Sequence, residues 1–313
     1  GGATAEGQRQ ILADYGITEE NMGCPIVSCM DTVEIGLSGV RHLPVRIDKH
    51  AAAADGILLF NRIKPHTSFR GKYESGLMKM MAIGLGKQHG AENIHHQSPA
   101  IMHELVEEYG LTILKNCNIL GGIAIIENAY DETCRIEAID RDDILAREPE
   151  LLQFAFERMP SLLVGACDVL VVDETGKNYS GTGVDPNITG TFSTEYAHGG
   201  VEVQRTCFLD LSAASHGNAL GVGLANVITK RFFDKIDTEK MYPNCLTSTV
   251  LTSARIPCVV ANDREAIQIG RIMLSEAYYR DVKAGKWPGV AACSEPEPLE
   301  FDGDGALLTP IEG

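Results

Sequence analysis

The sequence predicts an α/β protein with two α/β domains, mainly parallel sheets and a cleft between the domains. At 313 residues the chain exceeds the size at which one hydrophobic core keeps growing, so two domains are expected. Short apolar runs typical of buried strands alternate with helical patterns, which favours parallel sheets. A long amphipathic stretch ends at Pro160 and a new apolar run follows, so the expected domains are 1–160 and 161–313.

The expected elements of the first domain begin with a helix over 3–15. Thr4 is a suitable N-cap for this helix and Gly16 a suitable stop. Strands over 43–48 and 56–61 flank an alanine run that predicts a short helix, and this order is typical of a βαβ unit. The remaining expected elements are a helix over 98–110, a strand over 120–127 and a helix over 142–159.

The second domain is expected to begin with an apolar strand over 162–172. A helix over 217–235, a strand over 256–261 and a helix opened by Asp263 follow. The tail from Lys286 contains several prolines and glycines and has no repeat.

Composition excludes several classes of function. A formal charge of −16 argues against a nucleic-acid partner, because phosphate-backbone binding needs a basic surface. No apolar stretch has transmembrane length, so a membrane partner is not expected. The nine cysteines are scattered without a paired CxxC arrangement, which predicts buried, reduced thiols in a cytoplasmic protein. A homo-oligomer remains open.

The segment 61–96 contains the strongest chemical signal in the chain. Lys79 lies in the apolar run 76–84, where desolvation should disfavour its ammonium form and make the amine available for covalent chemistry. His66 follows the predicted strand 56–61, at the strand end where open α/β sheets bind ligands. His95 and His96 offer neutral ring nitrogens suited to a borderline metal. A surface lysine beside ordinary helix histidines is the alternative.

This segment resembles the nickel-pincer lactate racemase family, whose members invert 2-hydroxy acids. In that family a lysine follows a small-residue pair, and a histidine sixteen residues later ligates nickel. Here Ser75-Gly76 precedes Lys79 and His95 follows it by sixteen residues, with a glycine at 84 as in the family. His66 precedes Lys79 by thirteen residues, a few more than in the characterised racemases, and Ile83 replaces the family's proline.

The resemblance implies a role for each of these residues. Lys79 would tether a nickel-carrying pyridinium-3,5-dithio mononucleotide, His95 would ligate the nickel and His66 would take the hydroxyl proton. Arg70 and Lys72 would serve the cofactor phosphate or the substrate carboxylate, although both are equally good surface charges. A second catalytic histidine and a phosphate-binding loop would fall before Gly1, so we expect the chain to be a fragment of a longer protein.

In the second domain, the glycine-rich loop after the first strand offers Lys177 to a substrate carboxylate. A solvent-exposed connecting loop is the alternative. His198 and His216 stand beside small residues and fit turn roles better than a site. In the family, a glutamine and a lysine bind the substrate carboxylate, and this pair has no match here. The departure argues against lactate as the substrate more than against the type of reaction.

The function expected from these features is an isomerase, a racemase or epimerase of a small 2-hydroxy acid. Hydride removal and return through a cofactor avoids the costly abstraction of a proton next to a carboxylate. Two alternatives remain: a non-catalytic relative that binds small acids, and a metal-independent enzyme that forms a Schiff base at Lys79.

Overall fold

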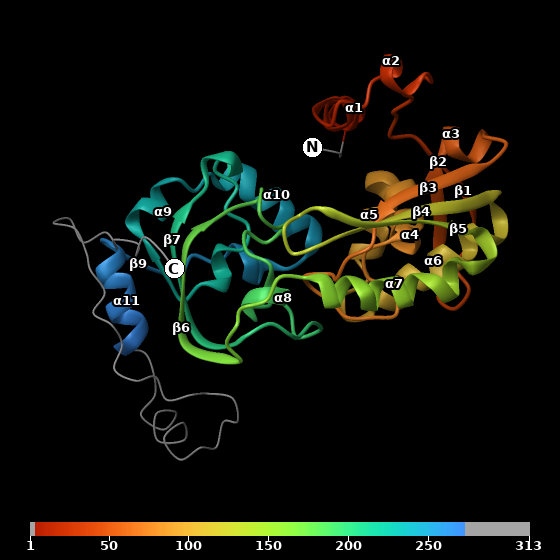
Figure 1. Cartoon of the computed structure of the whole chain (residues 1–313). Helices are drawn as coiled ribbons and strands as arrows, with labels where there is room; N and C mark the ends of the chain where they lie inside the picture. Colours follow the sequence, from red (N-terminus) through yellow and green to blue (C-terminus); the bar gives the residue numbers. More distant parts are fainter. Residues whose placement is uncertain (1–3, 273–313) are drawn as a thin grey trace. The chain divides into compact units, whose positions relative to one another are not determined.

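A computed structural model describes residues 4–272 of the chain (Figure 1). The chain divides into two compact units, Gly1–Met159 and Pro160–Gly313. Each unit combines a β-sheet with helices, so the protein is α/β as expected.

The first unit has two small sheets. Strands β1 (Thr32–Leu37) and β2 (Pro44–Asp48) form an antiparallel pair. Strand β3 (Ile57–Arg62) runs parallel to β4 (Ile119–Glu127), and β4 runs antiparallel to β5 (Thr133–Asp140). This unit is therefore mixed, and the expectation of mainly parallel sheets holds for the second unit rather than the first.

The predicted βαβ unit over residues 43–61 is wrong. The alanine run does form helix α3 (Lys49–Ala53), but β2 and β3 belong to different sheets. A helix of five residues is too short to act as a parallel crossover, which needs about a dozen residues or more. Strands β1 and β5 were not predicted.

Helices of the first unit differ in how much apolar surface they bury. Helix α1 (Ala5–Asp14) is capped by Thr4 as predicted and has no buried residue, and α2 (Glu19–Met22) has none either. Helix α6 (Met102–Asn116) and helix α7 (Ile144–Arg158) bury one face each. The hydrophobic core of the first unit includes fully buried side chains of α6, of α7 and of the segment around residue 80: Leu77, Met78, Met81, Leu105, Ile113 and Ile144.

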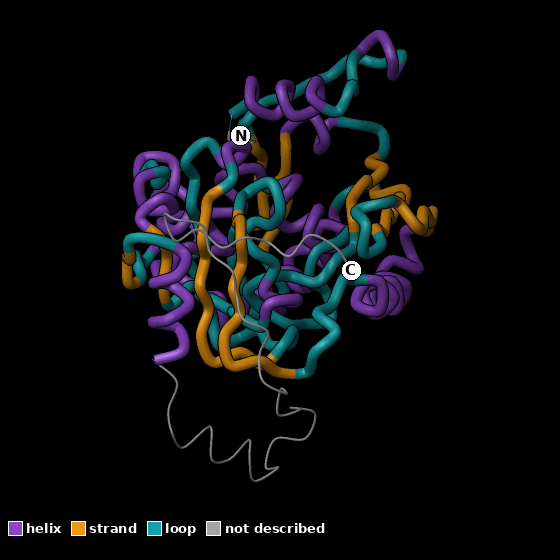
Figure 2. The backbone as a smooth tube through the Cα atoms, turned by 60° about the vertical axis from the view of Figure 1, so that its left-hand side comes forward, coloured by secondary structure: helices purple, strands orange, loops and turns teal. Residues whose placement is uncertain are grey.

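The second unit contains a four-stranded parallel sheet in the order β6-β7-β8-β9. Figure 2 shows the long strands of this sheet side by side. Its strands are β6 (Ala166–Thr175), β7 (Glu202–Leu211), β8 (Val227–Thr229) and β9 (Cys258–Val260). Successive side chains on a strand face opposite sides. Phe208 of β7 packs with Ile228 and Phe232 on one face, whereas Cys207 and Leu209 pack with helix α11 (Asp263–Ile272) on the other.

The predicted helix over 217–235 is wrong. This segment forms a 3₁₀ turn (Val222–Leu224), then β8, then the short helix α9 (Lys230–Asp234). Gly221 has φ 102°, a left-handed conformation that ends regular helix, and the β-branched run 227–229 favours a strand. The first strand begins at Ala166 rather than 162, and Leu163 before it is fully exposed. Helices α8 (Pro186–Thr189) and α10 (Thr238–Ser248) were not predicted.

The cysteines are more exposed than the sequence predicted. All eight described cysteines are free thiols, but only Cys207 and Cys245 are buried, while Cys24, Cys134 and Cys258 are exposed. Alternation along strands places some of these side chains outward.

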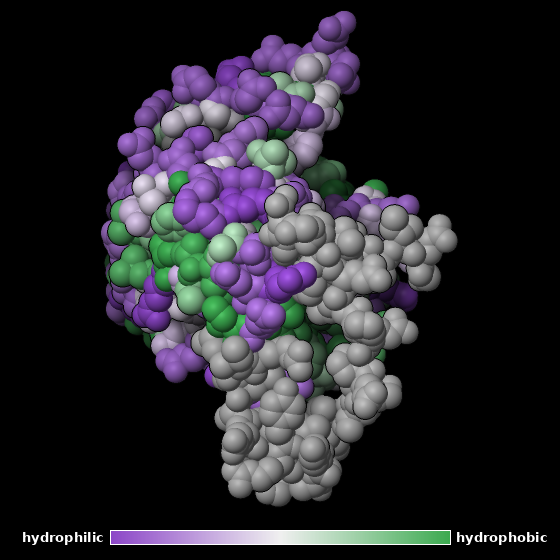
Figure 3. Space-filling view, turned by 90° about the vertical axis from the view of Figure 1, so that its left-hand side faces the viewer, coloured by the Kyte–Doolittle hydropathy of each residue, from purple (hydrophilic) through white to green (hydrophobic). Residues whose placement is uncertain are grey.

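Apolar residues also reach the surface on one side of the molecule (Figure 3). Within residues 4–272, no helix combines the length and apolar character needed to cross a membrane.

Candidate functional site

Lys79 lies at the junction of two helical types. Helix α4 (Leu77–Lys79) continues without a break into a π-helix (Met80–Leu85), and helix α5 (Lys87–His95) follows. A side chain at Gly84 would clash with the Met80 thioether, because an added Cβ would lie 2.2 Å from its Sδ. π-Helical turns within helices occur often at functional sites. The local geometry therefore sets Lys79 apart from an ordinary helical lysine.

The loop that carries His66 is closed on itself. The Lys64 N–H donates to the Ser75 carbonyl oxygen at 2.9 Å and joins the two ends of the loop. Glu74 is 2% exposed and occupies the inside of the loop. Its carboxylate accepts the His66 N–H at 2.6 Å and the Gly71 N–H at 3.3 Å. The backbone of His66 is thus fixed by a buried carboxylate.

The structure brings His66, Lys79 and His95 within electrostatic reach of one another. Burial, together with the positive charge of Lys64 and against the opposing effect of Glu74, lowers the pKa of Lys79 to about 8. Burial also holds the pKa of His66 well below its usual value, and Lys79 and His95 add to the effect. Burial and Lys79 lower the pKa of His95 as well. Both imidazoles are therefore neutral near pH 7.

Phe69 packs beside two members of this trio. Its ring centroid lies 4.2 Å from that of His66 with an interplanar angle of 31°. The Lys79 Nζ lies 5.8 Å from the same ring centroid, a cation–π distance. Phe69 is only 2% exposed, so it excludes water from one side of both groups.

One hydrogen bond fixes the resting tautomer of His66. The Ser68 backbone N–H donates to His66 Nδ1 at 3.1 Å. A nitrogen that accepts a hydrogen bond carries no hydrogen, so the neutral ring carries its hydrogen on Nε2.

Glu148 of helix α7 fixes the start of the Lys79 helix. This side chain is 1% exposed, and its carboxylate accepts the Met78 N–H at 3.0 Å. Burial raises its pKa to about 7, while the N–H groups of Met78 and Leu77 oppose the shift. Gly76 leaves room for this carboxylate, because an added Cβ would lie 2.3 Å from Glu148 Oε1. Asn61 also donates its side-chain N–H to the Gly76 carbonyl at 2.8 Å.

The two other basic residues predicted for this site make different contacts. The Arg70 guanidinium donates to the His66 carbonyl at 2.7 Å, pairs with Glu74 at 3.4 Å and lies 5.3 Å from the Phe156 ring. Arg70 therefore holds the His66 loop. Lys72 is exposed, and its amine lies 4.0 Å from Glu107 and 5.0 Å from the Tyr73 ring centroid. No described contact joins Lys72 to the trio.

Sequence reasoning missed four residues around the trio: Lys64, Phe69, Glu74 and Glu148. The first three lie in the same segment as His66, so their proximity had a signal in the sequence. Glu148 comes from a distant helix, and no spacing in the sequence connects it to Gly76.

In the second unit, the Lys177 loop is held by its own contacts. The Lys177 amine donates to the Gly181 carbonyl at 2.7 Å, and its backbone N–H donates to Ser215 Oγ at 2.8 Å. Burial lowers the pKa of this amine. The hydroxyl oxygens of Ser212 and Ser215 lie 2.9 Å apart, a hydrogen-bond distance. His216 takes φ 50° at the end of the adjoining turn, which agrees with a turn role.

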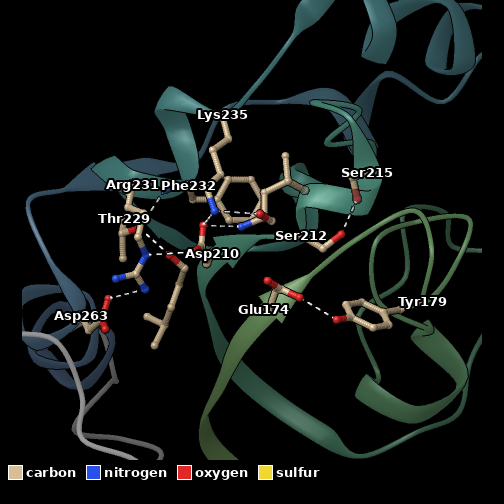
Figure 4. Close-up of polar contacts among 12 residues, drawn as sticks. Glu174, Tyr179, Asp210, Ser212, Ser215, Thr229, Arg231, Phe232, Lys235 and Asp263 are labelled. Carbon is tan, nitrogen blue, oxygen red and sulfur yellow. Dashed lines mark hydrogen bonds and ion pairs between the residues drawn. The ribbon is translucent and has the colours of Figure 1, made fainter.

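An ion-pair network lies at the carboxyl ends of β7, β8 and β9 (Figure 4). Asp210 pairs with Lys235 at 2.6 Å and with Arg231 at 3.2 Å. Arg231 also pairs with Asp263 at 3.2 Å. The two positive and two negative charges of these residues balance one another, so we interpret the network as a structural one that joins the ends of these strands.

Comparisons with known proteins identify no family for this chain. No family model matches it, and no curated protein matches it. Among solved structures it is similar to the lactate racemase apoprotein from Thermoanaerobacterium thermosaccharolyticum, with 12% sequence identity and a TM-score of 0.44. That alignment covers 83% of this chain and 65% of the racemase chain. A likeness at this level does not assign an activity.

Proposed function

We propose that the chain belongs to an enzyme that racemises or epimerises a 2-hydroxy acid, with its chemistry at Lys79, His66 and His95. The observation that carries the proposal is a lysine amine with its pKa lowered to about 8 beside two imidazoles that burial keeps neutral. Perturbed titratable groups gathered in this way are typical of catalytic sites.

The donor set fits a nickel-pincer nucleotide. No group of three or more metal-binding side chains occurs in the described part of the chain, so a metal here needs most of its ligands from a cofactor. His95 supplies one neutral imidazole, a ligand suited to nickel. Lys79 supplies an amine that is partly deprotonated near neutral pH and hence able to form a covalent tether. When bound, the cofactor would accept the substrate hydride and return it to either face.

His66 would exchange the proton of the substrate hydroxyl as the 2-hydroxy acid becomes a 2-keto acid and returns. Its resting tautomer carries hydrogen on Nε2 because Nδ1 accepts the Ser68 N–H. Taking a proton at Nε2 requires the other tautomer and the loss of this hydrogen bond, which costs about 1 kcal/mol. The penalty is small beside an enzymatic barrier.

The substrate carboxylate would meet a positive environment. Lys64 and Arg70 both act on His66 electrostatically, and Glu74 is the carboxylate that pairs with Arg70 in the same loop. Lys177 of the second unit remains a further proposed carboxylate ligand. Phe69 would keep water from the reacting groups.

The test is to express the chain with the cofactor-making genes and to measure nickel content, intact mass and racemisation of a panel of 2-hydroxy acids. We expect stoichiometric nickel and a covalent mass increase. Lys79→Ala should abolish the mass increase, and His95→Ala should lower nickel content. His66→Ala should keep nickel but lose turnover.

His96→Ala is the matched control, because His96 is the exposed neighbour of His95 and should retain nickel and activity. Absence of nickel and of added mass in the wild-type chain would refute the cofactor. Equal nickel loss in the His66 and His95 variants would refute their separate roles.

A second candidate function is favoured by the lowered pKa of Lys79. Such an amine can form a Schiff base with a 2-keto acid without any metal. Borohydride reduction in the presence of pyruvate would trap this adduct as a stable mass increase on the peptide that contains Lys79. Trapping in nickel-free protein would favour this function over the first.

A further inference from the structure

Helix α7 contacts both the His66 loop and the start of helix α4. In the loop, the Tyr73 hydroxyl donates to the Leu145 carbonyl of α7 at 2.9 Å. At the start of α4, the Met78 N–H donates to the Glu148 carboxylate at 3.0 Å. Leu145 and Glu148 lie about one turn apart on α7. One helix therefore holds the two segments that carry the proposed proton carrier and the proposed tether.

Glu148 acts as an N-cap that comes from a distant element. The residue before α4 is Gly76, which has no side chain to cap the first N–H groups of the helix. The Glu148 carboxylate takes this role, because the N–H groups of Met78 and Leu77 both favour its charged form. It is 1% exposed, and no cation within residues 4–272 acts on its charge. A carboxylate buried without a cation is costly, so packing alone does not account for it.

The backbone that carries Lys79 is fixed from two elements. Asn61 of β3 donates its side-chain N–H to the Gly76 carbonyl at 2.8 Å, and Glu148 of α7 holds the next N–H groups along the chain. Helix α4 has only three residues before the π-helix begins, so Lys79 belongs to this anchored turn. Helices in proteins are stabilised mostly by tertiary contacts of this kind. The depth of the Lys79 amine in the first unit therefore depends on where α7 holds the start of α4.

We propose that Glu148 is a positioning residue, whose hydrogen bonds to the start of α4 keep the Lys79 amine buried beside the His66 loop. The use of this amine as a tether rests on the proposed function, whereas its placement does not. Within the described residues, the charges that act on Lys79 are those of Lys64 and Glu74. Glu148 therefore acts on the amine through position rather than through its own charge.

The test compares Glu148→Leu with Glu148→Gln in the full chain. Both substitutions remove the same charge, but only glutamine keeps an oxygen that accepts the Met78 N–H. Labelling of Lys79 by a trace of acetic anhydride is followed against pH by mass spectrometry, and the midpoint of this profile is about 8 in the wild-type chain. We expect Glu148→Leu to raise the midpoint by about one pH unit, because the loosened turn lets the amine reach water. The amine fraction at pH 7 then falls about tenfold. Glu148→Gln should stay close to the wild-type midpoint.

Leu151→Ala is the matched control, because Leu151 is 1% exposed on the same helix and has no hydrogen-bonding side chain. It should lower the stability of the first unit but leave the midpoint unchanged. Gly76→Ala is the second test if Glu148→Leu fails to fold. Its Cβ would lie 2.3 Å from Glu148 Oε1 and displace the carboxylate, so it should also raise the midpoint.

An unchanged midpoint in the folded Glu148→Leu chain, or in Gly76→Ala where that variant replaces it, would overturn the proposal. So would an equal rise in Glu148→Gln or in Leu151→Ala, because a general loss of packing would then explain the effect. The labelling needs neither nickel nor cofactor, so it stands apart from the proposed function. In the cofactor-loaded chain, the added mass should fall in Glu148→Leu and persist in Glu148→Gln. Absence of added mass in the wild-type chain would count against the proposed function alone.

Discussion

Replacement of Lys79 by Met tests whether the lysine is held in a destabilised charged state. The pKa of Lys79 falls from its usual 10.5 to about 8, mainly through burial. Below pH 8 both the folded and the unfolded chain hold the proton, and the folded state bears the full penalty. Between pH 8 and 10.5 the unfolded state binds more protons, so the wild-type free energy of unfolding rises with pH.

The size of the effect follows from the shift. At about 1.36 kcal/mol per pKa unit, the penalty is roughly 3 kcal/mol at pH 7 and roughly 1.4 kcal/mol at pH 9.5. Met has a similar length and keeps the apolar contacts of the stem. The attraction to Glu74 is already contained in the pKa of about 8, but loss of the Phe69 contact offsets part of the gain, by about 1 kcal/mol. We therefore expect Lys79→Met to stabilise the first unit by about 2 kcal/mol at pH 7 and by little at pH 9.5.

The assay is urea unfolding followed by circular dichroism at both pH values. Pulsed hydrogen exchange of peptides from helix α6 assigns the transition to the first unit, because α6 forms much of its core. Lys115→Met is the control, since Lys115 is exposed near the end of the same helix and should change stability little at either pH. A lower free energy of unfolding for Lys79→Met at pH 7, or a gain that is equal at both pH values, would refute the reasoning.

Three further predictions concern the surroundings of Lys79. Burial raises the pKa of Glu148 from 4.5 to about 7, so the folded state binds more protons than the unfolded state between these pH values and stability falls as pH rises. Glu148→Gln should remove this part of the pH dependence of the melting temperature, and an unchanged pH profile would contradict the reasoning. Gly76→Ala should destabilise the first unit by about 1–3 kcal/mol in urea unfolding, because its Cβ meets the Glu148 carboxylate, whereas Gly39→Ala, which meets open space, should not. Lys64→Met should raise the pKa of Lys79 by removing a like charge, and mass-spectrometric labelling of Lys79 against pH would show the shift; a downward shift would be inconsistent with that contact.

Local signals in the sequence determined several elements of the fold. Thr4 predicted the start of α1, the apolar runs predicted β3, β4 and β9, and Pro160 marked the end of the helix that precedes it. Each of these features depends on neighbouring residues, either on a capping side chain or on a continuous apolar strand. The α/β class followed because strand and helix patterns alternate along the whole chain.

The partners of each strand were decided only by the tertiary structure. A strand pattern at 43–48 does not say whether its partner is β1 or β3, and the short length of α3 made the antiparallel pair the outcome. The segment 217–235 had helical composition in part, but Gly221 and the β-branched run at 227–229 directed it into a turn and a strand.

The candidate site shows the same division. The apolar run around Lys79 and the histidines on either side of it were visible in the sequence, because residues in one segment stay near one another. The state of these groups depends on contacts that sequence spacing does not contain. Glu148 reaches the start of the Lys79 helix from α7, and Ser68 sets the tautomer of His66 through one backbone hydrogen bond. Burial, which shifts the pKa of Lys79, exists only once the whole first unit has packed around it.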